Sequence, residues 1–218
     1  MGDALIGAFV AFVFSVLLPR NLARRPKRYL RGVYGEIATC LGTIQRALRD
    51  GNATTMGDAA TELRGVESVI DGASEVIASA QQIARLNPIL RADRPVLDEC
   101  GRQRALAMRL ARTLDMLIRQ GRGVILEAGR QPNAAALVGI AATTMRAHST
   151  ALAHWQRPDL ARRLAVQLAD ACAPGAVPDS DWRGSVLVSL MRSIAIDALQ
   201  ATGLSRAQAR AHLPDVDD

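Results

Sequence analysis

The spacing of apolar residues predicts a chain made almost entirely of helices. From about residue 26 to residue 213, apolar positions recur at intervals of three and four, which places them on one face of a helix. No stretch of alternating apolar and polar residues is long enough to predict a strand. The first apolar stripe consists of Val33, Ile37, Leu41, Ile44 and Leu48.

A second stripe has the spacing of a heptad repeat. Its intervals alternate between three and four, as in antiparallel helices that pack side by side or in a coiled coil. Small alanine side chains along it favour close approach of a neighbouring helix. We therefore predict an all-α fold, with an antiparallel bundle of long helices. The second stripe consists of Leu63, Val66, Ile70, Ala73, Ile77, Ala80 and Ala84.

Turn residues divide the pattern into successive helices. Asp50-Gly51-Asn52 ends the first, because glycine and asparagine adopt the left-handed conformation of a helix end. Residues 55–58 resemble a capping box and predict the start of the second helix. Asn87-Pro88 stops that helix, and Asp93 followed by Pro95 predicts the start of a third.

The third helix is predicted to run to about residue 128. Gly121 and Gly123 are expected to weaken its last turns, because glycine is a poor helix former. Residues 129–132 then form a turn. The apolar side of the third helix consists of Leu106, Leu110, Leu114, Leu117 and Ile125.

The remaining sequence predicts an apolar helix, a shorter one, a loop and a last long helix. The loop is residues 173–181, which contain two prolines and a glycine, and Asp181 is expected to cap the helix that follows. Gly203 ends that helix, and Ser205 caps a final short one. The apolar positions are Leu137, Ala141, Met145 and Leu152 in residues 134–155, Leu160, Leu164 and Leu168 after Pro158, and Val186, Leu190, Ile194 and Ala198 in the last long helix.

A run of fifteen residues without charge, residues 4–18, opens the chain and contains all three of its phenylalanines. As a helix it spans about 22 Å, and residues 1–19 together approach the roughly 30 Å of a bilayer core. We predict a transmembrane helix over residues 1–19. A buried core helix and a targeting segment are the alternatives, although a signal peptide carries its positive charge before the apolar run. Here Asp3 precedes the run and arginines follow it.

The net charge of +6 has its origin in one segment, residues 20–31, which contains six basic residues and no acidic one. Elsewhere basic and acidic residues are equal in number, at 21 each. Basic residues beside a membrane helix mark its cytoplasmic side and attract anionic lipid. We predict that this segment contacts lipid headgroups, at the plasma (inner) membrane. Nucleic acid is the less favoured partner, although Tyr29 and Tyr34 lie near enough to stack on bases. The predicted contact residues are Arg20, Arg24, Arg25, Lys27, Arg28 and Arg31.

No catalytic, cofactor-binding or metal-binding residue is predicted, and we do not expect an enzyme. His148 and His154 are six residues apart and do not share a helix face. Phosphate-binding glycine motifs and a nucleophile motif are missing from the sequence. The three cysteines are interpreted as core residues, the two tryptophans as core residues beside helix ends, and the carboxylates Asp98, Glu99 and Asp115 as members of solvated ion pairs with arginines.

The junction between the apolar run and the basic segment resembles that of a known family. Asp3, Gly7 and Pro19, followed by basic residues and a long helix, are similar to the last membrane helix of the fusaric acid resistance protein-like (aromatic acid exporter) family. The turn in residues 48–58 and the Leu-Asn-Pro end of the heptad helix at residues 86–88 fit the same outline. The resemblance covers residues 3–128 and implies a plasma-membrane efflux protein with a helical cytoplasmic domain.

One departure from that family limits what the resemblance implies. Its exporters have several membrane helices in a block, whereas this sequence predicts one, and a single helix cannot enclose a polar path through lipid. We therefore expect a truncated member, a fragment, or a part that assembles with other membrane subunits or with itself. The expected divisions are residues 1–19 in the membrane, 20–31 beside it, 32–213 as a cytoplasmic bundle and 214–218 as an acidic tail.

The expected function is thus the C-terminal part of an efflux transporter, in which the helical domain serves assembly or regulation. One alternative is a single-pass, membrane-anchored adaptor that binds a partner through its heptad helices. Another is a soluble helical module that binds a small ligand or nucleic acid.

Overall fold

A computed structural model describes residues 22–154, 157–173 and 182–214, and within them every regular element is a helix. The predicted all-α fold is therefore confirmed. The elements are α2 (Arg24–Asp50), α3 (Ala53–Leu86), the 3₁₀ helix η1 (Pro88–Asp93), α4 (Arg94–Ala128), α5 (Pro132–His154), α6 (Asp159–Ala171), α7 (Trp182–Ala201) and α8 (Arg206–Arg210).

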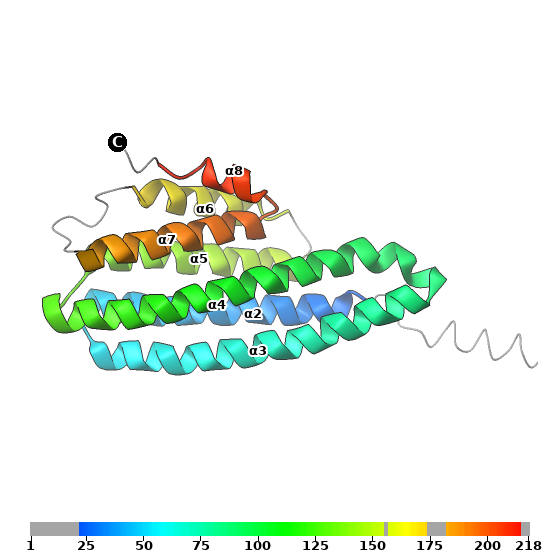
Figure 1. Cartoon of the computed structure of the whole chain (residues 1–218), viewed down its shortest axis with the longest axis horizontal. Coiled ribbons are helices and arrows are strands. Elements are labelled where there is room, and N and C mark those ends of the chain that lie inside the picture. Colours follow the sequence, from blue (N-terminus) through cyan, green and yellow to red (C-terminus); the bar gives the residue numbers. More distant parts are fainter. Residues whose placement is uncertain (1–21, 155–156, 174–181, 215–218) are drawn as a thin grey trace, which may run out of the picture.

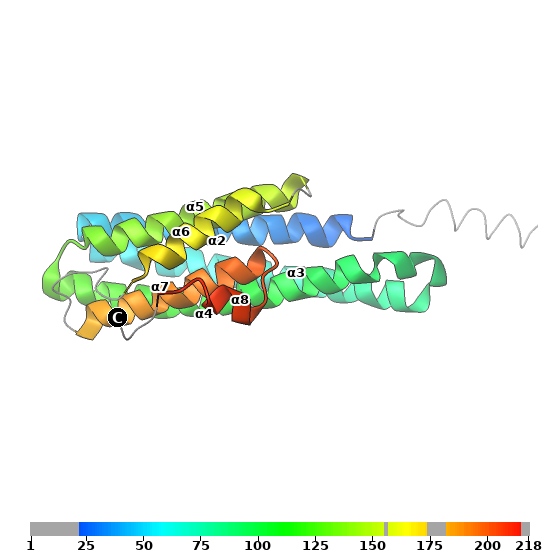
Figure 2. The ribbon, with the colours of Figure 1, turned by 90° about the horizontal axis from the view of Figure 1, so that it is seen from above.

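The long helices run up and down the length of the molecule (Figure 1). Helix α2 is central and packs against α3, α4 and α5, while α7 packs against α4, α5 and α6. Helices α3 and α4 form a long hairpin, which extends past the first turn of α2 in both views (Figures 1 and 2). The start of α2, the end of α5 and the turn of this hairpin therefore lie toward the same end of the bundle.

The predicted apolar stripes form the core of this bundle. All five residues of the first stripe are fully buried in α2, and all five predicted for α4 are at most 5% exposed. Burial of the apolar face contributes most of the stability of long amphipathic helices in water. All seven heptad residues of α3 are also buried, at 0–4% exposure. This heptad seam is therefore buried within the chain, where α3 packs against α2 and α4.

The turn between α2 and α3 is tight. Gly51 adopts a left-handed conformation with φ of 68°, as predicted for this helix end. The prediction that residues 55–58 cap α3 is wrong. Asn52 is the cap, because its side-chain oxygen accepts hydrogen bonds from the backbone N–H groups of Thr54 and Thr55, so the helix starts at Ala53.

Helix α4 extends to Ala128, as predicted, and includes both Gly121 and Gly123. Gly121 is buried where α4 packs against the α2–α3 turn region. A Cβ atom at Gly121 would lie 2.9 Å from the terminal methyl carbon of Met56. The absence of a side chain thus allows close packing here.

The later helices follow the prediction with one shift of register. In α6 the buried residues are Ala161, Ala165, Leu168 and Ala169, whereas Leu160, one of the apolar positions named for this helix, is 55% exposed. Gly203 follows α7 with φ of 99°. Ser205 caps α8 as predicted, and Gln208 completes a capping box with it.

Several predictions concern residues outside the described parts of the chain. These are the membrane helix over residues 1–19, Arg20, Trp155, the loop and its cap Asp181, and most of the acidic tail. Within the described parts, Gly184–Ala201 is the stretch long and apolar enough to cross a membrane, and 56% of it is buried inside the bundle. A core helix has the same length and composition, and α7 packs against α4, α5, α6 and α8.

Candidate functional site

Residues 24–31 of the basic segment identified in the sequence form the first two turns of α2. Helical geometry separates its residues, so that Pro26 and Leu30 face the bundle while Arg24, Arg25 and Arg28 are exposed. Arg31 is exposed as well, and Lys27 is half-buried. Burial lowers the pKa of Lys27, whereas the charges of Cys100 and Asp93 raise it.

These basic residues surround a hollow beside the end of α5. The hollow has a volume of about 920 Å³. The first turn of α2 contains no acidic residue and no side chain caps it, so the positive end of the helix dipole adds to the charge. Anionic groups such as phosphates are the natural ligands of such a surface. We call this surface the basic hollow, and its lining consists of Arg24, Arg25, Lys27, Arg28, Arg31, Leu152 and Ala153.

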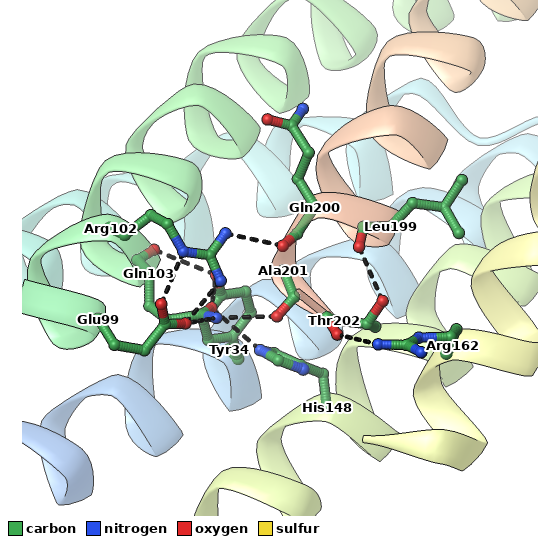
Figure 3. A network of polar contacts seen from close by, with 10 residues as sticks. All are labelled: Tyr34, Glu99, Arg102, Gln103, His148, Arg162, Leu199, Gln200, Ala201 and Thr202. Carbon is green, nitrogen blue, oxygen red and sulfur yellow. Dashed lines mark hydrogen bonds and ion pairs between the residues drawn. The ribbon is translucent and has the colours of Figure 1, made fainter. Parts of the chain in front are cut away.

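Next to the basic hollow lies a polar cluster drawn from three helices, in which Tyr34, Gln103 and His148 are buried and the Glu99–Arg102 pair is exposed (Figure 3). It consists of Tyr34 from α2, Glu99, Arg102 and Gln103 from α4, and His148 from α5. The Tyr34 hydroxyl donates to Gln103, with an O–O distance of 2.8 Å to Oε1 and 3.1 Å to the backbone oxygen. The rings of Tyr34 and His148 meet edge to face at a centroid distance of 4.5 Å.

The hydrogen bonds of Gln103 determine the tautomer of His148. Gln103 Nε2 donates to the backbone oxygen of Ala201, which can only accept, at 2.8 Å. Oε1 of Gln103 therefore faces Tyr34 and lies 3.1 Å from Nε2 of His148. Since Oε1 is an acceptor, Nε2 of His148 carries a proton. Together with the lowered pKa of this ring, this gives the neutral tautomer protonated on Nε2. Nδ1 of His148 is buried and has no hydrogen-bond partner among the residues that the structure describes.

Burial and charge set the protonation states in this cluster. Burial lowers the pKa of His148 to about 4, with Glu99 opposing and Arg102 reinforcing the effect. For Glu99, burial raises the pKa, but hydrogen bonds from Arg102 and Gln103 outweigh it and the net shift is downward. Arg102 contacts both oxygens of Glu99, at 2.6 and 2.7 Å, and also donates to the backbone oxygen of Gln200. The charges are thus paired with each other.

A pocket of about 190 Å³ opens between the polar cluster and the basic hollow, and Leu152 lines both spaces. Its walls are mainly apolar, and its polar groups include His148, Gln103 and the Glu99–Arg102 pair. Because these polar groups already bond to one another, the cluster holds α2, α4, α5 and the end of α7 in register. It thereby fixes the orientation of the basic turns of α2.

The other residues singled out in the sequence lie apart from this site or support it. Cys40, Cys100 and Cys172 are free and buried, as predicted. Burial raises the pKa of each thiol, to about 12, 11 and 11 respectively, which makes them unreactive. The ion pairs Glu99–Arg102 and Asp115–Arg119 are present, whereas Asp98 accepts a hydrogen bond from Gln81 instead. Within the described ranges, no three His, Cys, Asp or Glu side chains gather as metal ligands do.

Sequence reasoning missed the polar cluster, although one signal was present. Tyr34 and Gln103 occupy positions on the buried faces of α2 and α4, where the neighbouring positions are aliphatic. A buried glutamine requires partners, so a polar residue within an apolar stripe predicts a hydrogen-bonded contact. Which residues become the partners depends on how α5 and α7 pack. The apolar stripe gives no information on that packing.

No family model, curated protein or solved structure matches this chain.

Proposed function

We propose that this chain is a membrane-tethered helical domain of an efflux assembly of the fusaric acid resistance protein-like kind. In this proposal residues 1–19 cross the inner membrane, and the bundle lies on the cytoplasmic side. The basic turns of α2 contact the headgroups of anionic lipid. The domain serves assembly or regulation, and the transport path is formed together with other membrane subunits.

The observation that carries the proposal is the exposed basic surface at the start of α2. Four arginines of the basic hollow are exposed, and they follow directly on the apolar run in the sequence. A basic surface beside an apolar segment favours anionic lipid over nucleic acid, because the apolar segment holds the charges at the bilayer. The resemblance of residues 3–128 to that family supports the assignment to an exporter.

A partner of this domain must contact a surface other than the heptad seam of α3. That seam lies inside the bundle at 0–4% exposure, so the adaptor alternative lacks the surface we first expected it to use. Assembly through the outer faces of the bundle is compatible with either function.

The headgroup contact is tested by titrating the purified full-length chain in detergent with phosphatidylglycerol or phosphatidylcholine. Lipids bound to the protein are counted by native mass spectrometry. We expect the anionic lipid to bind more tightly, and the triple variant Arg24→Gln, Arg28→Gln, Arg31→Gln to weaken this binding at least about tenfold. Each basic residue at an anionic surface contributes about 1 kcal/mol.

The matched control removes the same number of charges at the opposite end of the bundle. Arg119→Gln, Arg122→Gln and Arg130→Gln should leave binding of phosphatidylglycerol unchanged. Equal affinity for the two lipids, or equal loss in the two triple variants, would exclude a headgroup site at the start of α2.

A further inference from the structure

The turn of the α3–α4 hairpin exposes apolar side chains that are not part of the core of the bundle. Residues 83–94, which we call the hairpin tip, project beyond the start of α2 (Figure 1). Leu86 is 78% exposed and Ile83 is 39% exposed. Leu86 is the last residue of α3, and most of its apolar surface is accessible to an external apolar phase.

The beginning of the described chain is packed against the base of this tip. Leu22 and Ala23 are buried in a small apolar cluster with Ala80, Ala84 and Leu97 of the hairpin. A groove of about 530 Å³ runs beside this contact, between the start of α2 and the later turns of α3. The point at which the apolar N-terminal run joins the bundle therefore lies beside the hairpin tip.

The charged residues of the hairpin tip, like those of the basic hollow, are mainly basic. Arg85 and Arg91 are exposed at the tip, and Asp93 is its single acidic residue. The guanidinium of Arg94 donates to the backbone oxygens of Ala84 and Arg85, and so stabilises the end of α3. An exposed leucine flanked by arginines has the composition of a segment that lies in the interface of an anionic bilayer.

We propose that the hairpin tip inserts Leu86 into the headgroup region of an anionic bilayer, as a second contact beside the start of α2. Two contacts at one end of a rigid hairpin fix the long axis of the bundle relative to the membrane. A single tether would leave that orientation free. This inference rests on the proposed membrane location. It adds that the bundle has a fixed orientation relative to the membrane.

The test uses the full-length chain in nanodiscs of phosphatidylcholine and phosphatidylglycerol that contain a lipid with a nitroxide on its headgroup. A thiol-reactive fluorophore is attached at Leu86→Cys, and its quenching by the nitroxide is measured. The native thiols are at most 2% exposed, so the label goes to the introduced cysteine. The matched control is Leu126→Cys, since Leu126 is 69% exposed in the last turn of α4, at the opposite end of the hairpin.

We expect quenching at position 86 to exceed that at position 126 several-fold. Adding Arg85→Gln and Arg91→Gln should reduce the quenching at position 86. Equal quenching at positions 86 and 126 would overturn the inference, as would quenching at 86 that persists unchanged without the two arginines.

A third label separates this inference from the proposed function. Tyr29 is 38% exposed within the basic turns of α2, so Tyr29→Cys reports on the first contact. Quenching at position 29 without quenching at 86 would overturn the tip contact alone. Absence of quenching at both positions would overturn the headgroup contact of α2 as well.

Discussion

Replacing Gln103 by methionine is expected to lower the free energy of unfolding by about 3–5 kcal/mol. Methionine has a similar length but no hydrogen-bonding amide. The substitution leaves the Nε2–H of His148 and the backbone oxygen of Ala201 buried without a partner. Each such group costs about 1–3 kcal/mol, and the bond from Gln103 to Glu99 is lost as well. Urea unfolding of the full-length chain, followed by circular dichroism, measures the change.

The same substitution at Gln81 is the control for this prediction. Gln81 is half-buried and makes two long contacts, of 3.3 and 3.4 Å, so Gln81→Met should cost less than about 1 kcal/mol. The double variant Gln103→Met, His148→Leu should lose less than the sum of its single variants, because it removes both members of a pair. A loss below about 1 kcal/mol for Gln103→Met would show that the polar cluster does not hold the helices together.

The second large effect is a loss of stability in mild acid that depends on His148. Its pKa is about 4 in the folded chain against an ordinary value of 6.5. Between these values the unfolded state binds more protons than the folded state, so stability falls as the pH falls. The contribution is fully present above about pH 6.5 and is lost by about pH 4, and it amounts to about 3 kcal/mol.

The charged groups near His148 act on this pH profile in known directions. The pKa of Glu99 is lowered, so its contribution also disappears toward acid, at the lower end of the range. Burial raises the pKa of Asp197, against the effect of Arg109, and this carboxyl acts in the opposite sense. Comparing the native chain with a variant at position 148 isolates the contribution of His148 to the pH dependence of stability.

The variant is His148→Gln, whose amide nitrogen can donate to Gln103 in place of Nε2. Its unfolding free energy should change less between pH 6.5 and pH 4 than that of the native chain, by about 3 kcal/mol. His212→Gln, at an exposed position, should keep the native profile. Parallel profiles for the native chain and His148→Gln would contradict a neutral, buried His148.

The sequence predicted most of the fold because the apolar face of each helix is defined by residues three and four positions apart. Intervals of three and four placed the apolar faces of α2, α3 and α4 correctly, and glycine at position 51 marked a helix end that requires a left-handed residue. The predicted start of α3 failed because Asn52 caps the helix three residues earlier. The side chain of Asn52 accepts from the N–H groups of Thr54 and Thr55, so Thr55 already lies within the helix and is not its cap.

Long-range contacts explain what the sequence could not predict. Leu160 fits an apolar stripe in α6, but the neighbouring alanines allow α6 to lie closer to α5 and α7 with Leu160 outside. The partners of Gln103 come from helices 45 and 98 residues further along the chain, and no local pattern links them. The basic segment was visible in the sequence, whereas the hollow that it forms with the end of α5 depends on how α2 and α5 pack.

The polar cluster and the basic surface belong to one end of the bundle and serve different purposes. The cluster ties α2 to α4, α5 and the end of α7, which keeps the arginines of α2 in a fixed arrangement. The proposed membrane contact depends on this arrangement, since charges on a rigid helix bind a surface with less loss of conformational entropy than charges on a loop.

Extraction of bacterial membranes with alkaline carbonate decides whether the chain is held in lipid. The full-length chain is expressed with a C-terminal tag, and the pellet and the supernatant are compared by immunoblotting. We expect the chain to stay with the membrane pellet, and a variant with Phe9, Phe12 and Phe14 replaced by aspartate to move to the supernatant. Release of the native chain into the supernatant would contradict both the membrane tether and the exporter function.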